Sequence, residues 1–183
     1  DPLGPRLAKQ PAILQAEAEK QFRFPNQYAN QRPVSATWTV TGSAAFIDDE
    51  NLDIENFMNE MQESTEATGS AAPSPQSWID AFEQADIIFA ITISSKLSGS
   101  WQSLISAKDM YLEDHPDKKI FAIDSKMAGS GLAILALKLA EYIDENLSYE
   151  EICTRITEYH KHIGLLFVLE SVENLVKNGS RRP

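Results

Sequence analysis

The sequence predicts a three-layer α/β domain with a mainly parallel β-sheet, a fold in which strands alternate with covering helices. Two apolar, β-branched runs, at residues 87–93 and 119–123, suit strands that are buried on both faces. Each run is followed by a turn rich in hydroxyl side chains or glycine, and then by a segment with helical apolar spacing. Such turns lie at the carboxyl edge of a parallel sheet, where open α/β folds bind ligands.

The size and charge of the chain exclude several classes of protein. Its 183 residues suit one domain, and a net charge of -11 opposes binding to nucleic acid or to an anionic membrane surface. The single cysteine, Cys153, cannot form an internal disulfide, which favours a cytoplasmic location. No apolar run approaches the roughly 20 residues that span a bilayer, and the first residues do not resemble a secretion signal.

Residues 1–41 differ in composition from the rest of the chain. Five prolines interrupt this segment, and its apolar residues lack a sustained period. A short helix at residues 12–20 and a strand at residues 38–40 are the elements it favours. We expect an atypical arm or a foreign segment that adds little to the core, followed by the α/β domain at residues 42–183.

Helix signals recur through the remaining chain. Asp53 is a suitable N-cap for a helix whose apolar face is expected to pack in the core. That face comprises Ile54, Phe57, Met58 and Met61. Ser74 followed by Pro75 predicts a second helix start, and Ser148 opens a capping box. A third strand is expected at residues 164–169 and a last helix at residues 171–177.

The two turns carry the candidate ligand-binding residues. The first turn supplies Ser94, Ser95, Ser98 and Gly99, and the second supplies Ser125. Free backbone N–H groups at a helix start favour an anion, although Ser98 is equally well explained as an N-cap alone.

Three classes of function remain open from the residues alone. A serine hydrolase would need a base, but there is no G-x-S-x-G elbow and no histidine at a predicted strand end. His160 and His162 point apart on a helix and make a poor metal pair, and phosphate-loop and dinucleotide fingerprints are absent, so no metal or cofactor is expected. A ligand-free protein-interaction module is the second alternative. The favoured function is binding a small anionic head with apolar walls around it, for which a fatty carboxylate is the natural ligand.

Three segments resemble the signatures of a known family, the DegV family of bacterial lipid-binding proteins. Residues 91–100, reading ITISSKLSGS, resemble its I-S-S-x-L-S-G-T signature. Residues 123–131 resemble the second signature, and residues 175–179 resemble an L-x-x-G element that usually precedes an arginine. The resemblance extends from about Phe46 to Gly179.

This resemblance implies that the chain binds a long-chain fatty acid without catalysing a reaction and presents it to a separate, ATP-dependent fatty acid kinase subunit. Ser70 stands at the hydroxyl position of the family's T-S-Q-P-S motif, Ser98 at the serine of L-S-G, and Arg181 is a loose match to the arginine. A first strand with a T-D-S motif has no match in residues 1–41. The family's carboxyl-terminal domain is expected to lie beyond Pro183.

Overall fold

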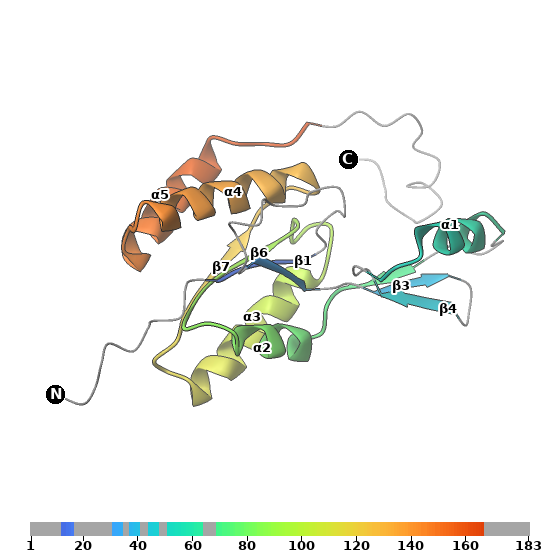
Figure 1. Cartoon of the computed structure of the whole chain (residues 1–183), viewed down its shortest axis with the longest axis horizontal. Coiled ribbons are helices and arrows are strands. Elements are labelled where there is room, and N and C mark those ends of the chain that lie inside the picture. Colours follow the sequence, from blue (N-terminus) through green and yellow to red (C-terminus); the bar gives the residue numbers. More distant parts are fainter. Residues whose placement is uncertain are drawn as a thin grey trace.

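The structure, a computed structural model, describes residues 12–16, 31–34, 37–40, 44–47, 51–63 and 69–166. The described residues form a four-stranded sheet and a three-stranded sheet. Figure 1 shows the main sheet between two layers of helices, with the smaller sheet and helix α1 (Ile54–Glu63) to the side. In the part of the chain that the structure describes, no helix is long and apolar enough to cross a membrane.

The main sheet contains β2 (Gln31–Val34), β1 (Ala12–Ala16), β6 (Ile87–Thr92) and β7 (Lys119–Asp124), in that spatial order. Every pairing in it is parallel, which confirms the predicted α/β class. The chain passes from β1 to β2 on one side and from β6 to β7 on the other. The direction of winding therefore reverses between β1 and β6, and such a reversal is where open α/β sheets bind ligands.

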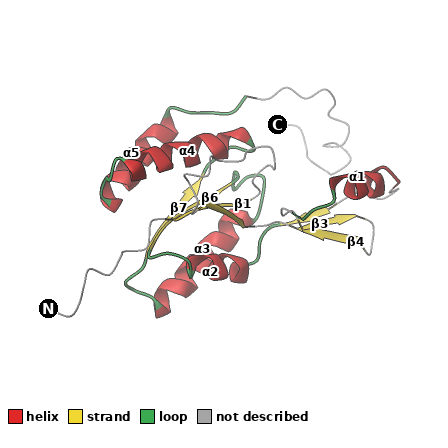
Figure 2. Ribbon diagram, in the orientation of Figure 1, coloured by secondary structure: helices red, strands yellow, loops and turns green. Residues whose placement is uncertain are grey.

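Two helices cover each face of this sheet. Helices α2 (Pro75–Phe82) and α3 (Ser100–Asp114) lie on one face, and α4 (Ser130–Asp144) and α5 (Tyr149–Lys161) lie on the other (Figure 2). Alternate residues of β6 serve the two cores: Ile88 packs with α2 and α3, and Phe89 packs with α4 and α5. Because β6 is buried on both faces, its apolar run is continuous rather than alternating.

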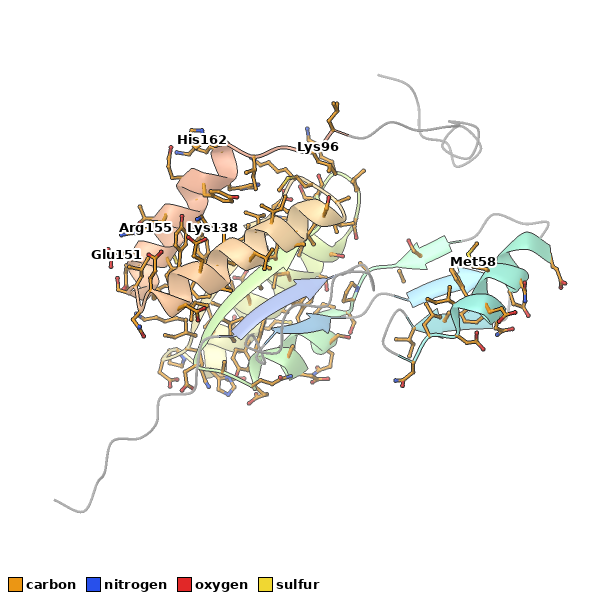
Figure 3. The ribbon with its side chains drawn as sticks, turned by 45° about the horizontal axis from the view of Figure 1, so that its top comes forward. Met58, Lys96, Lys138, Glu151, Arg155 and His162 are labelled. Carbon is orange, nitrogen blue, oxygen red and sulfur yellow. The ribbon has the colours of Figure 1, made fainter. Side chains whose placement is uncertain are left out.

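A smaller antiparallel sheet orders its strands as β4 (Ala44–Ile47), β3 (Thr37–Val40) and β5 (Gly69–Ala71). Helix α1 (Ile54–Glu63) lies beside it, with the rings of Phe46 and Phe57 5.3 Å apart. Ile54 and Met58 remain 53% and 45% exposed, so the prediction that they pack in the core is wrong (Figure 3). Periodicity identified an apolar helical face, but the small sheet covers only part of it.

The predicted helix starts agree with the structure. The backbone N–H of Ser77 donates to Ser74 Oγ at 3.1 Å, and that of Glu151 donates to Ser148 Oγ at 3.3 Å. Asp53 Oδ1 accepts from the N–H of Asn56 at 3.0 Å. These caps are local in sequence, which explains why they were predictable.

The amino-terminal region differs from expectation. Residues 12–16 form strand β1 instead of a helix, because they pair with β2 on one side and β6 on the other. The expected arm therefore contributes two strands to the main sheet, while the division of the chain at residues 41 and 42 stays a prediction. Residues 164–166 form no strand. The rest of the expected third strand, the helix at 171–177 and Arg181 lie outside the described residues.

Candidate ligand-binding edge of the sheet

The first candidate turn, residues 93–99, joins the carboxyl end of β6 to α3, as predicted. Ser94 organises it: its carbonyl oxygen accepts from the N–H groups of Leu97 and Ser98 at 2.8 and 3.1 Å. The Ser94 hydroxyl is buried and accepts from the N–H of Lys96 at 3.3 Å. Ser94 thus shapes the turn from inside, whereas Lys96 projects away from the sheet at its outer end (Figure 3).

The start of α3 combines a glycine with two hydroxyls. Gly99 is the N-cap residue, with φ -72° and ψ -4°, so the expectation that Ser98 fills this position is wrong. Ser98 Oγ nevertheless accepts from the N–H of Ser100 at 3.1 Å and lies 2.8 Å from Ser100 Oγ. Because Ser98 is half-buried and Ser100 is fully buried, Ser98 presents the outer hydroxyl of the pair.

The second candidate turn follows β7 and leads into α4. Ser125 is completely buried, and its hydroxyl both donates to the carbonyl of Met127 and accepts from the N–H of Met127, each at 3.1 Å. Lys126 and Gly129 have φ values of 56° and 54°. A side chain at Gly131 would place a Cβ atom 2.7 Å from Met127 Cβ, so only glycine fits where α4 begins. The internal hydrogen bonds of Ser125 and the close packing at Gly131 therefore fix the conformation of this second turn.

Hydrogen bonds hold the two turns side by side. The N–H of Ser94 donates to the carbonyl of Met127 at 2.8 Å, and the N–H of Ser125 donates to the carbonyl of Thr92 at 3.2 Å. Asp124 adds side-chain bonds: Oδ1 accepts from the N–H of Ser95 at 3.0 Å, and Oδ2 accepts from Ser95 Oγ at 2.6 Å. The Ser95 hydroxyl is therefore engaged with Asp124.

The Asp124 carboxylate has a lowered pKa. Partial burial alone would raise it, but the hydrogen bonds from the Ser95 hydroxyl and from the backbone N–H groups of Lys126 and Ser95 together outweigh that effect. Asp124 was not predicted as a site residue. The signal available in the sequence was its place directly at a strand end, beside a serine-rich turn.

His160 reaches the carboxyl edge of the main sheet, although the sequence placed no histidine at a predicted strand end. His160 Nε2 lies 2.7 Å from the backbone carbonyl oxygen of Ser125 and bonds to it across 35 residues of sequence. The imidazole is thus engaged with the backbone of the second turn. Helix α5 brings it there, and no local motif marks that docking.

Ser70, the other predicted site residue that the structure describes, lies outside the two turns. Ser70 is exposed on β5 of the small sheet, opposite Trp38. The chain leaving β5 approaches the first turn, since a Cβ atom at Gly99 would lie 3.8 Å from the Cβ of Ala72. Ser103 Oγ then donates to the carbonyl of Pro73 at 2.6 Å, which fixes this approach. The ligand role predicted for Ser70, like those predicted for the residues of the two turns, stays a prediction.

The arrangement offers hydroxyls and the backbone of a helix start at the reversal point of a parallel sheet, beside Leu97, whose apolar side chain is 65% exposed. Within the described ranges, no three His, Cys, Asp or Glu side chains gather as a metal would require. These features suit a ligand with a polar head and an apolar body, the ligand chemistry that the sequence predicts.

The chain belongs to the DegV family. The model of that family, described as an uncharacterised protein of the DegV family, matches residues 37–181. A DegV domain-containing protein of Streptococcus pneumoniae is 46% identical over 158 residues, which cover 86% of this chain and 56% of the relative. The chain spans about half the length of the curated relatives it matches.

Two solved structures are similar to this fold. The Streptococcus pneumoniae fatty acid kinase B3 protein, loaded with linoleic acid, has a TM-score of 0.77 and 40% identity, over 83% of this chain and 54% of that one. A DegV family protein from Eubacterium eligens, loaded with heptadecanoic acid, has a TM-score of 0.82 and 28% identity, over 94% of this chain and 61% of that one.

Proposed function

We propose that this protein binds a long-chain fatty acid at the edge formed by the two turns. The observation that carries this proposal is the first turn itself, which presents the Ser98 hydroxyl and the start of α3 beside the exposed side chain of Leu97. A carboxylate suits hydroxyl and N–H donors, and an acyl chain suits the apolar surface. Two related structures loaded with fatty acids support the same ligand class.

Ser98 and Gly99 are the residues proposed to contact the carboxylate. Ser70 and Arg181 are proposed to contribute from the T-S-Q-P-S-like segment and from the L-x-x-G-like segment. Ser94, Ser95 and Ser125 are proposed to act in the same site. Their hydroxyls already hydrogen-bond Lys96, Asp124 and Met127 respectively, which supports an indirect contribution through the shape of the turns.

The protein is proposed to be a non-catalytic subunit that presents its fatty acid to a separate kinase subunit in the cytoplasm. A related protein described as fatty acid kinase B3 supports this assignment. The serine-hydrolase alternative requires a histidine hydrogen-bonded to the attacking hydroxyl. His160 Nε2 instead bonds to the carbonyl oxygen of Ser125, which favours the binding role.

The test combines lipid extraction from the purified protein with fluorescence titration of cis-parinaric acid. We expect a co-purifying fatty acid, and we expect Ser98→Ala to raise the Kd about tenfold, because a hydrogen bond to a charged group contributes about 1.5 kcal/mol. Thr154→Ala, which removes an exposed hydroxyl on α5, is the matched control and should not change the Kd.

Two results would contradict the proposal. Failure of the unaltered protein to bind cis-parinaric acid would remove the ligand assignment. A burst of p-nitrophenol from an activated ester, lost in Ser98→Ala, would indicate a hydrolase. Kinase presentation is tested separately, by adding a purified fatty acid kinase ATPase subunit and measuring acyl phosphate formation.

A further inference from the structure

We infer that Asp124 is the positioning residue of this binding edge, acting through Ser95 without contacting the ligand. The inference rests on the proposed carboxylate site and gives a role to a residue for which the resemblance implied none. It also changes the role of Ser95, whose hydroxyl is committed to Asp124 at 2.6 Å. We call the group formed by Asp124, Ser95 and Lys126 the Asp124 clasp.

The geometry of the clasp explains how one carboxylate controls two turns. Asp124 is the last residue of β7 and pairs in register with Thr92, the last residue of β6. Its Oδ1 atom accepts from the N–H of Ser95 in the first turn and from the N–H of Lys126 in the second, each at 3.0 Å. A single side chain therefore fixes the backbone of the turn after β6 and of the turn after β7.

The clasp depends on an ionised carboxylate. Three donors converge on its two oxygens, and a carboxylate is the side chain that accepts at both. Asparagine keeps one accepting oxygen but replaces the other with an NH₂ donor, so the Ser95 hydroxyl would have to turn and accept, and the charge that strengthens all three bonds would be lost. The lowered pKa of Asp124 is consistent with the same geometry.

The clasp shapes the turn whose other end carries the proposed ligand contacts. Ser95 lies three residues before Ser98, and the backbone between them is closed by the bonds to the Ser94 carbonyl. Releasing Ser95 would remove the bonds that hold this closed turn against the end of β7. The bonds from Ser94 to Met127 and from Ser125 to Thr92 would remain, so we expect a local change and not a loss of fold.

The clasp also surrounds the negative charge of Asp124, which lies close to the proposed carboxylate site, with three hydrogen-bond donors. An aspartate without donors would repel a ligand carboxylate, whereas hydrogen-bond donors offset its charge. The variant Asp124→Asn separates positioning from repulsion, because the two effects change fatty acid affinity in opposite directions. Weaker fatty acid binding would indicate positioning, and tighter binding would indicate that the charge of Asp124 acts mainly by repulsion.

The experiment uses the full chain and cis-parinaric acid, with Asp124→Asn, Ser95→Ala and the double variant. We expect Asp124→Asn to raise the Kd about tenfold and Ser95→Ala to raise it by less, because the N–H of residue 95 still donates to Asp124 Oδ1. The double variant should raise the Kd no further than Asp124→Asn, because both substitutions act on one unit. Ser95→Thr should rescue most of the affinity lost in Ser95→Ala. Asp109→Asn, on the exposed surface of α3, controls for the loss of one negative charge.

A second measurement tests, in the absence of ligand, whether Asp124 fixes the backbone of the first turn. Amide hydrogen exchange and the amide chemical shift at Ser95 should change in Asp124→Asn, while amides of β6 and β7 keep their protection. Ser95→Ala provides the same readout if Asp124→Asn fails to fold. Unchanged exchange at the turn, additive losses of affinity, or tighter binding by Asp124→Asn would overturn the inference. Absence of cis-parinaric acid binding by the unaltered protein would instead reject the proposed function, and the exchange data would still decide on the clasp.

Discussion

The imidazole of His160 is hydrogen-bonded to the backbone carbonyl of Ser125, with Nε2 and the oxygen 2.7 Å apart. This bond links the last turn of α5 to the turn that follows β7. Ser125 is completely buried, so an unpaired carbonyl there would be costly. The helix that covers one face of the sheet thereby supports the candidate binding edge.

Replacing His160 should destabilise the protein. We expect His160→Ala to lower the free energy of unfolding by about 1–3 kcal/mol, because it leaves a buried carbonyl oxygen without its donor. His162→Ala is the matched control, since that side chain is 72% exposed and pairs with an exposed glutamate. Urea unfolding at pH 7 measures both, and equal losses would contradict the assigned role of His160.

A methyl group should not be tolerated at Gly131. Its Cβ atom would lie 2.7 Å from Met127 Cβ and 2.9 Å from Met127 Sδ, at the start of α4. We expect Gly131→Ala to cost about 1–3 kcal/mol of stability through overpacking. Gly164→Ala is the control, because nothing lies within 4 Å of the added atom. Thermal unfolding of both variants tests the prediction, which fails if Gly131→Ala unfolds no earlier than the control.

The hydroxyl of Thr92 should be dispensable for stability. Thr92 is fully buried at the end of β6, and its Oγ1 has no hydrogen-bond partner among the described residues. Replacing it with valine removes a buried unpaired hydroxyl, so we expect Thr92→Val to raise the free energy of unfolding by about 1 kcal/mol. Urea unfolding provides the measurement. A clear loss of stability would show that the hydroxyl does have a stabilising partner.

Stability should depend on the ionisation of Asp124. Its pKa is lowered in the folded protein, so the unfolded chain binds the proton more readily and stability rises with pH in this range. The contribution is present above the unfolded pKa of about 3.9 and is lost as pH falls through the lower folded value. The stability difference between the unaltered protein and Asp124→Asn should therefore shrink between about pH 5 and pH 2. A difference that is constant across this range would contradict the prediction.

Additional protein surface that buries the acyl chain should increase the affinity for fatty acid. The chain spans about half of its relatives, and each methylene buried contributes about 0.8 kcal/mol. A chimera that appends the remaining half of the Streptococcus pneumoniae relative and covers four or five methylenes should bind cis-parinaric acid several hundred times more tightly, a gain of roughly 3 to 4 kcal/mol. Equal Kd values for the two proteins would show that the binding edge is complete within the present chain.

Much of the central fold was predictable because its signals are local. The continuous apolar run of β6 indicated a strand buried on both faces, and the caps at Ser74 and Ser148 marked two helix starts. The position of the Ser94–Gly99 turn followed from the change of composition after that strand. The family signatures fall on the same residues, so the ligand class could be proposed from the sequence.

Other features depended on which segments meet in space. The apolar face of α1 was visible in the sequence, yet Met58 stays 45% exposed because the neighbouring sheet is small. Strand β1 lacked an apolar period and was expected to be helical. Pairing with two neighbouring strands determines its conformation, and such pairing leaves no signal within the strand itself.

The sequence by itself determined the α/β class, the two hydroxyl-rich turns and the residues that carry the family resemblance, because these follow from composition and spacing over a few residues. The tertiary structure decided which hydroxyls are engaged and which groups support them. Ser95 meets Asp124 across 29 residues and Ser125 meets His160 across 35. Hydrogen bonds act over about 3 Å in space whatever the separation in sequence, so only the packed sheet and helices could bring these pairs together.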